Sequence, residues 1–315
     1  MGFFSAVFGK GELSEKGKFE TLRDDGVRAM QMGELPYAEK CLLAALQLQD
    51  DLRTKGLLAE VELRMQQHDK ALPLLRQLNA AGGDLEIALL QAQTEGRLSL
   101  FEEEQETCGK ILSQHAGEPR ALYLLAEAES GLQNHFPAIA HLTQCLETRP
   151  DYQAARLLRA KILTGMGQFS EALDDAGTLV AADGDNEEYL LLHAGLLAAT
   201  GKVEEAEADY GKLRALNPFG TETVLGLGQL YEQTARWDKA LALYDEAVEL
   251  MPSFAEAYKR RGGVKHHLKD DAGAAEDLKR SLELAPESAA ELDGSYTSVE
   301  NQMNDRYRSM NPYGF

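Results

Sequence analysis

Small apolar residues and prolines recur along the chain with a period of 34 residues. The recurring alanines are Ala172, Ala206, Ala240 and Ala274, and the prolines are Pro150, Pro218, Pro252 and Pro286. On this period the chain divides into eight repeats that begin near residues 19, 52, 85, 119, 153, 187, 221 and 255. A period of this length is typical of stacked supersecondary units. The predominance of Leu and Ala over aromatic residues favours helices over strands.

The small residues predict where two helices of one repeat touch. Position 8 is Gly or Ala in every repeat, and position 20 is Ala in seven of the eight. Antiparallel helices approach closely only where both carry small side chains, and larger residues at positions 4, 7, 11, 24 and 27 then surround the contact. Gly33, Gly167 and Gly201 fall at position 15, where the first helix must turn into the second. The prolines fall at position 32, where the second helix must end.

The seventh repeat carries the fullest form of the pattern. Its defining residues are Val224, Leu227, Gly228, Tyr231, Ala240, Tyr244, Ala247 and Pro252. This pattern resembles the tetratricopeptide repeat (TPR), and the resemblance extends over residues 19–288. It implies an all-α fold, a right-handed α-solenoid (superhelix) of helix-turn-helix repeats.

The third repeat departs from this pattern. It has Glu104 where the small residue belongs and Cys108 where the aromatic residue belongs. A carboxylate buried at a tight helix contact is costly. We therefore expect either a loosened junction or a shifted register here, with the weakest packing of the array.

The two ends extend beyond the repeats. An apolar stripe at helical spacing, comprising Leu292, Tyr296, Val299, Met303, Tyr307 and Met310, predicts a capping helix and tail over residues 289–315. Residues 1–18 form an apolar extension with Phe3, Phe4, Val7 and Phe8. The alternative for the C-terminal segment is that it occupies a groove in its own or a neighbouring molecule. The interpretations of the N-terminal segment are that it folds over the first repeat, stays disordered, or contacts a membrane or a partner.

The resemblance implies that the first helices line a concave groove, with positions 5, 6 and 9 among those that face it. The predicted groove residues are Leu89, Leu90, Gln93, Tyr123, Leu124, Glu127, Leu157, Leu158, Lys161, Leu191, Leu192, Leu225, Gln229, Lys259 and Arg260. They form an apolar floor with sparse polar groups, which is typical of a surface that binds an extended segment or a helix. The alternative is that some of these leucines are core residues.

Charged groups in the predicted groove constrain the ligand. TPR proteins that capture a carboxylate use Asn at position 9, and no repeat here has one. The last repeat has a basic cluster around Lys259, Arg260 and Arg261, which suits an acidic ligand or, alternatively, forms a solvated face paired with nearby carboxylates.

Composition narrows the classes of function. With 32 basic and 52 acidic side chains the net charge is −20, which excludes general binding of nucleic acid or anionic lipid. Three widely spaced cysteines favour a reducing compartment, so a cytoplasmic location is expected. No apolar run is long enough to insert stably into a membrane.

The sequence contains no nucleotide-binding, hydrolase or metal-ligand motif, so we expect neither an enzyme nor a cofactor or metal. The favoured interpretation is a non-catalytic scaffold or adaptor that binds a peptide or helix of an unidentified partner protein. The alternative is a structural subunit of a homo-oligomer that associates through its terminal segments.

Overall fold

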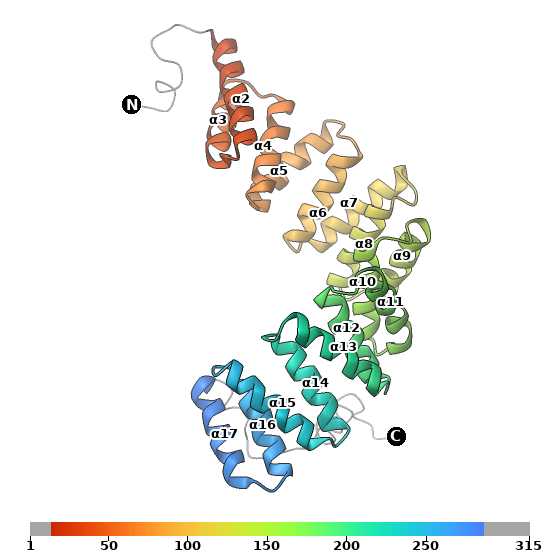
Figure 1. Ribbon diagram of the computed structural model, residues 1–315. Helices are drawn as coiled ribbons and strands as arrows, with labels where there is room; N and C mark the ends of the chain where they lie inside the picture. Colours follow the sequence, from red (N-terminus) through yellow and green to blue (C-terminus); the bar gives the residue numbers. More distant parts are fainter. Residues whose placement is uncertain (1–13, 287–315) are drawn as a thin grey trace, which may run out of the picture. The chain divides into compact units, whose positions relative to one another are not determined.

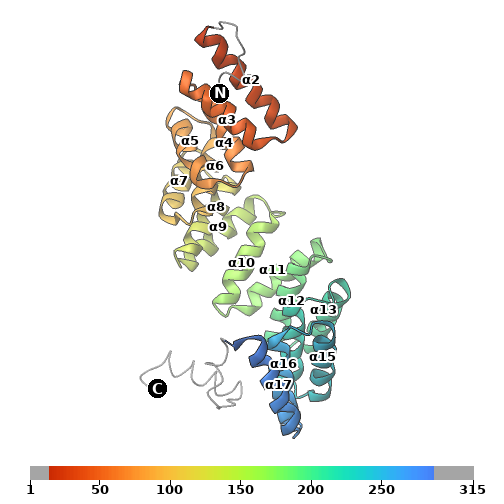
Figure 2. The ribbon, with the colours of Figure 1, turned by 90° about the vertical axis from the view of Figure 1, so that its left-hand side faces the viewer.

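The computed structural model describes residues 14–286, and this part of the chain contains sixteen helices and no strand (Figures 1 and 2). The first helices of the pairs are α2 (Glu15–Met32), α4 (Leu52–Arg64), α6 (Leu85–Arg97), α8 (Pro119–Gly131), α10 (Gln153–Gly165), α12 (Glu187–Ala199), α14 (Thr221–Gln233) and α16 (Ala255–His267). The second helices are α3 (Leu35–Leu48), α5 (His68–Ala80), α7 (Phe101–Gln114), α9 (His135–Thr148), α11 (Phe169–Ala182), α13 (Val203–Leu216), α15 (Trp237–Leu250) and α17 (Asp271–Leu284). The chain is therefore an all-α helical-repeat solenoid.

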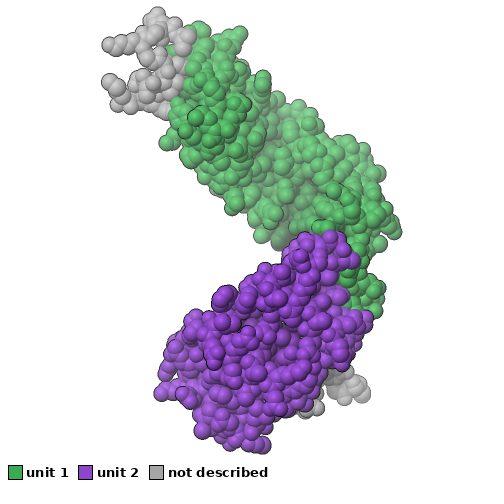
Figure 3. Space-filling view, viewed as in Figure 1, with its two compact units in different colours: residues 1–179 green, residues 180–315 purple. Residues whose placement is uncertain are grey.

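The chain forms two compact units, residues 1–179 and 180–315 (Figure 3). The first contains α2 to α10 and most of α11, and the second contains α12 to α17. The predicted capping helix and tail over residues 289–315 lie outside the described residues, as do residues 1–13 of the N-terminal extension. Residues 15–18 belong to α2, whose N-terminus is capped by the Ser14 side chain accepting from the Gly17 amide.

The turn inside each repeat has the same backbone conformation eight times. Position 15 has a positive φ in Gly33, Gly167 and Gly201, and equally in Gln66, Ser99, Gln133, Ala235 and Lys269. The next residue then donates a backbone hydrogen bond to position 11, as in Leu100 to Glu95 at 2.9 Å. Glycine at position 15 therefore predicted three of the eight turns. At the other five, packing of the two helices outweighs a left-handed backbone cost of about 1–2 kcal/mol.

The core lies where the predicted small residues meet. The seven alanines at position 20 are at most 4% exposed. In the seventh repeat Gly228 of α14 lies against the Tyr244 ring of α15, so a Cβ on Gly228 would collide with it. The larger side chains then close around these contacts, and Tyr244 is fully buried.

Some repeats place a charged pair between the two helices in place of an apolar one. Arg159 at position 7 contacts Asp175 at position 23 (2.7 Å), and the third-last repeat places His193 beside Asp209 in the same way (2.6 Å). In the last repeat Arg261 contacts Asp277 (2.6 Å). The hydrophobic pattern did not predict these pairs, although the spacing of sixteen residues between a base and an acid is visible in the sequence.

Candidate peptide-binding face

The predicted groove residues of the first unit divide between core and surface. Leu89 in α6 and Leu124 in α8 are each 6% exposed and belong to one core cluster with Ile111 of α7. These two predictions are wrong, because the side chains pack between neighbouring repeats and offer no surface to a ligand. Leu90, one residue further along α6, is 39% exposed. The other predicted residues of this unit are exposed (Gln93, Lys161) or half-buried (Tyr123, Glu127, Leu157, Leu158).

In the second unit the predicted residues are mostly accessible. Leu191, Leu192 and Leu225 are half-buried and Gln229 is exposed. Leu191 lines a cavity of about 460 Å³ together with Phe219, which is 61% exposed.

The basic cluster of the last repeat is ion-paired. Arg260 contacts Glu256 (3.0 Å) and Glu232 (3.7 Å), and Lys259 contacts Glu256 (3.5 Å). Arg261 contacts Asp277. These contacts match the alternative interpretation, in which the basic residues pair with neighbouring carboxylates.

The burial of Leu124 leads to a testable expectation. We expect Leu124→Glu to destabilise the first unit by about 3 kcal/mol or more, since the change places a carboxylate among apolar side chains. Leu90→Glu is the matched control and is expected to cost less than about 1 kcal/mol, because Leu90 is partly solvated. Hydrogen exchange across α6 to α8 measures both, and equal protection in the two variants would place Leu124 at the surface.

The structure brings three predicted groove residues together around one cavity. Gln93 of α6, Glu127 of α8 and Leu158 of α10 line a cavity of about 200 Å³ within the first unit. The remaining lining residues are Gly96, Arg97, Phe101, Glu104, Ser130 and Gly131. Positions 9, 12 and 13 of both α6 and α8 thus contribute to this cavity.

Two glycines make space for large side chains from α7. A Cβ on Gly96 would lie 2.6 Å from an oxygen of Glu104, and one on Gly131 would lie 2.7 Å from the Phe101 ring. Neither distance is possible for a real Cβ. The third repeat therefore keeps its register, and Gly96 provides the space that the Glu104 side chain occupies. The sequence pattern did not predict this pairing.

Glu104 is a buried carboxyl group on the cavity wall. The residue is 1% exposed, and its Oε2 has no hydrogen-bond partner among residues 14–286. Burial, followed by the negative charges of Glu127 and Glu95, raises its pKa to about 8, while Arg97 lowers it. Burial also raises the pKa of Glu127, against a hydrogen bond donated by Tyr123. In the sequence Glu104 stands out only as an irregularity, although an acid in place of Ala at one of eight equivalent positions is a usable signal of a functional group.

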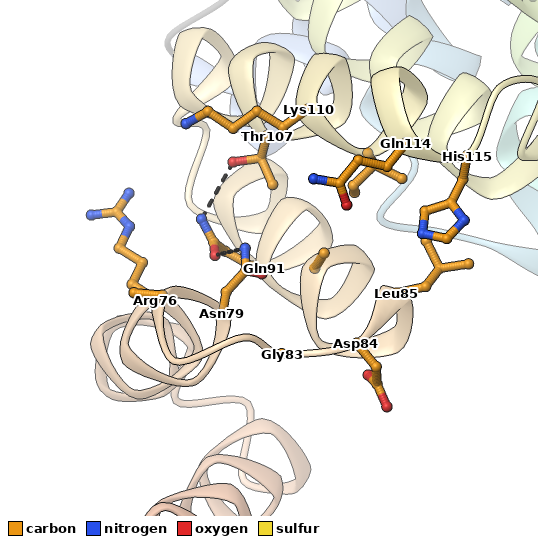
Figure 4. A pocket seen from close by; sticks show the side chains of 13 residues that line it. Arg76, Asn79, Gly83, Asp84, Leu85, Gln91, Thr107, Lys110, Gln114 and His115 are labelled. Carbon is orange, nitrogen blue, oxygen red and sulfur yellow. Dashed lines mark hydrogen bonds between the residues drawn. The ribbon is translucent and has the colours of Figure 1, made fainter.

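A larger cavity of about 620 Å³ lies between α5, α6 and α7 (Figure 4). Asn79, Gln91 and Thr107 point toward one another from these three helices, with Asn79 donating to Gln91 (2.9 Å) and Gln91 to Thr107 (3.3 Å). Thr107 and Gln91 in turn donate to Glu95, which also contacts Arg76 (3.1 Å). These polar groups satisfy one another and stabilise the packing of the repeats.

The cysteines are buried thiols. Cys41, Cys108 and Cys145 are not disulfide-bonded, and burial raises the pKa of Cys145 to about 11. Within residues 14–286 no group of three or more metal-binding side chains occurs. None of the helices that the structure describes is both long and apolar enough to cross a membrane.

Paired antiparallel helices, joined by identical turns and packed through small residues at two fixed positions, define an α-helical repeat protein. Models of the tetratricopeptide repeat match residues 138–196 and 225–289. The chain is a tetratricopeptide-repeat protein.

Known proteins resemble parts of the chain. A stretch of 60 residues, 19% of this chain, is 40% identical to a UPF0162 protein of Xylella fastidiosa (strain Temecula1 / ATCC 700964) and spans only 21% of that protein. Among solved structures, YrrB, described as a TPR protein with an unusual peptide-binding site, is 18% identical over 58% of this chain and 94% of its own (TM-score 0.48). A tetratricopeptide repeat protein from Parabacteroides merdae ATCC 43184 is 20% identical over 85% and 93% (TM-score 0.47).

Proposed function

We propose that this chain is a non-catalytic scaffold that binds a segment of a partner protein on the face formed by α6, α8 and α10. Protein-interaction scaffolding is the general role of TPR proteins, and the site on this chain is the specific part of the proposal. The observation that carries it is the cavity in which Gln93, Glu127 and Leu158 meet.

The chemistry of this face suits a bound segment. Leu158 is half-buried and lines the cavity, and Leu90, which is 39% exposed, lies one helical turn before the cavity residue Gln93 on α6. Gln93 and Glu127 supply polar groups that orient a ligand, and of the two only Glu127 can carry a charge. Apolar contact area with a few placed polar groups is the usual composition of a site that binds a peptide.

The homo-oligomer alternative depends on residues 1–13 and on the segment from Tyr296 to Met310, all outside the described residues. It remains a prediction, as does the cytoplasmic location, which the buried thiols support.

Selection of peptides tests the binding face directly. A displayed library of random peptides of about twelve residues, long enough to span roughly 40 Å when extended, is selected against the full chain. We expect the selected peptides to bind the variant Leu90→Ser/Gln93→Trp at least about tenfold more weakly, because it removes apolar surface and obstructs the cavity.

Phe136→Ser is the matched control for this experiment. Phe136 lies on the second helix α9 and is 73% exposed, so this change also removes apolar surface but leaves the proposed face intact. We expect wild-type affinity. The proposed function would be contradicted if the selected peptides bound both variants with wild-type affinity, or if the library yielded no binder.

A further inference from the structure

The cavity between α6 and α8 contains a buried acid that the fold does not require. Seven of the eight repeats place Ala at position 20, and those alanines allow the two helices of the pair to touch. The third repeat places Glu104 there and opens space for it with Gly96 on the facing helix. The result is a carboxyl group that lies on the wall of a cavity, 1% exposed, with Oε2 unpartnered among the described residues.

Most other buried acids among residues 14–286 have a cationic partner; Glu62 also has an unpartnered Oε2, but it lines none of the cavities described above. Asp175 contacts Arg159 and Arg156, Asp277 contacts Arg261 and Lys265, and both acids are at most 3% exposed. An unpartnered buried polar atom is uncommon and costly, because it has lost its water without gaining a hydrogen bond. Glu104 is therefore a buried acceptor whose partner can come from outside the chain through the adjoining cavity.

The cavity's size and charge indicate what that partner is. A volume of about 200 Å³ is smaller than the roughly 300 Å³ at which sites for whole small molecules begin, and suits a single side chain. Glu104 and Glu127 line the cavity with two carboxyl groups beside one cationic residue, Arg97, which lowers the pKa of both. Around this site the whole chain carries a net charge of −20, which attracts a basic segment and steers it toward the surface.

We propose that the cavity of Glu104 and Glu127 receives a lysine or arginine side chain of the bound partner segment, with Glu104 accepting its hydrogen bond. This inference rests on the proposed function and specifies its ligand: a basic side chain enters the cavity, and neighbouring apolar residues of the segment lie on Leu90 and Leu158. The carboxyl group then acquires the charge-assisted hydrogen bond that it lacks within the chain.

Binding of a cation also changes the protonation of Glu104. The charged groups that face it are Glu95 and Arg97 from α6 and Glu127 from α8, and Cys108 lies one turn away on its own helix. With a pKa of about 8, Glu104 is largely protonated at pH 7 in the unbound chain. An incoming ammonium group favours the carboxylate, so binding releases a proton and tightens as the pH rises toward 9.

Peptide pools of defined composition test the inference. Four pools of random peptides of about twelve residues carry lysine, arginine, norleucine or glutamate at the central position, and fluorescence anisotropy measures their affinity for the full chain. We expect the lysine and arginine pools to bind wild type about tenfold or more tightly than the norleucine pool, since a charge-assisted hydrogen bond is gained. In Glu104→Gln this preference is expected to fall to about twofold or less, with helicity unchanged.

The pH profile supplies a second readout. Affinity of the lysine pool for wild type is expected to rise by about tenfold or more from pH 6 to pH 9, because lysine stays charged throughout while Glu104 becomes ionised. Glu104→Gln and Glu104→Ala, the second of which restores the residue of the other repeats, are expected to give flat profiles.

The outcomes separate this inference from the proposed function. Pools that bind equally whatever their central residue would overturn the basic-side-chain inference and leave a binding face intact. A preference that survives in Glu104→Gln and disappears in Glu127→Gln would overturn the role of Glu104. If no pool binds, the proposed function and this inference both fail.

Discussion

Replacement of Glu104 by glutamine is expected to stabilise the third repeat by about 4–5 kcal/mol at pH 9 and by less than about 1 kcal/mol at pH 5. The folded chain raises the pKa of this carboxyl group from 4.5 to about 8, chiefly through burial. At a pH between these two pKa values, the carboxyl group is protonated in the folded state and ionised in the unfolded state. Stability of the wild type therefore falls as the pH rises through this window, whereas an amide of the same shape does not ionise.

Hydrogen exchange over α6 to α8 between pH 5 and pH 9 measures this difference, after correction for the intrinsic exchange rate. Glu106→Gln is the control, because Glu106 lies on the same helix, is 69% exposed and contacts only Lys110 (2.7 Å). Its replacement is expected to leave local stability essentially unchanged at either pH, because this ion pair is solvated. Parallel pH profiles for wild type and Glu104→Gln would show that Glu104 is not buried.

Removal of the buried acid in the last repeat is expected to destabilise the second unit by about 3 kcal/mol. Asp277 is 2% exposed and contacts Arg261 (2.6 Å) and Lys265 (2.8 Å). Asp277→Leu therefore leaves the partly buried Lys265 without this partner and leaves Arg261 with Asp245 (2.9 Å). Unfolding followed by fluorescence of Trp237, which stacks on His267 of α16, measures the loss.

The preceding repeat suggests how to recover this stability. There the equivalent positions are Leu227 and Leu243, both buried. We therefore expect Arg261→Leu/Asp277→Leu to regain most of the loss, since an apolar pair of similar volume needs no desolvation of charge. If the double variant is less stable than Asp277→Leu, the charged pair has a structural role that leucines do not replace.

The helices and their order were predictable from the sequence because they depend on local and periodic properties. Small residues at positions 8 and 20, glycine at position 15 and proline at position 32 repeat often enough to reveal the pairing of helices. Five of the eight turns lack glycine, as at Ala235, yet the period alone places them. The basic cluster at Lys259 and Arg260 was also visible, together with the carboxylates that pair with it.

The binding face was predictable only in part. Three of the residues predicted from their repeat position, Gln93, Glu127 and Leu158, line a single cavity, and their role in binding stays a prediction. The repeat position did not distinguish these residues from Leu89 and Leu124, which occupy closely similar positions and lie in the core. Leu89 and Leu124 are buried because side chains of the neighbouring helices, among them Ile111 of α7, pack against them, and those contacts are not encoded in the repeat position.

The sequence alone established the solenoid of paired helices, because the residue pattern that predicts the helix contact recurs in eight repeats. The tertiary structure was needed to place Glu104 against Gly96 and beside Glu127. That arrangement joins residues from three helices, and the departure of Glu104 from the repeat pattern did not indicate which residues would surround it. A contact that occurs in only one repeat does not appear in the periodic pattern of the sequence. The buried acid and its cavity are therefore seen only in the packed structure.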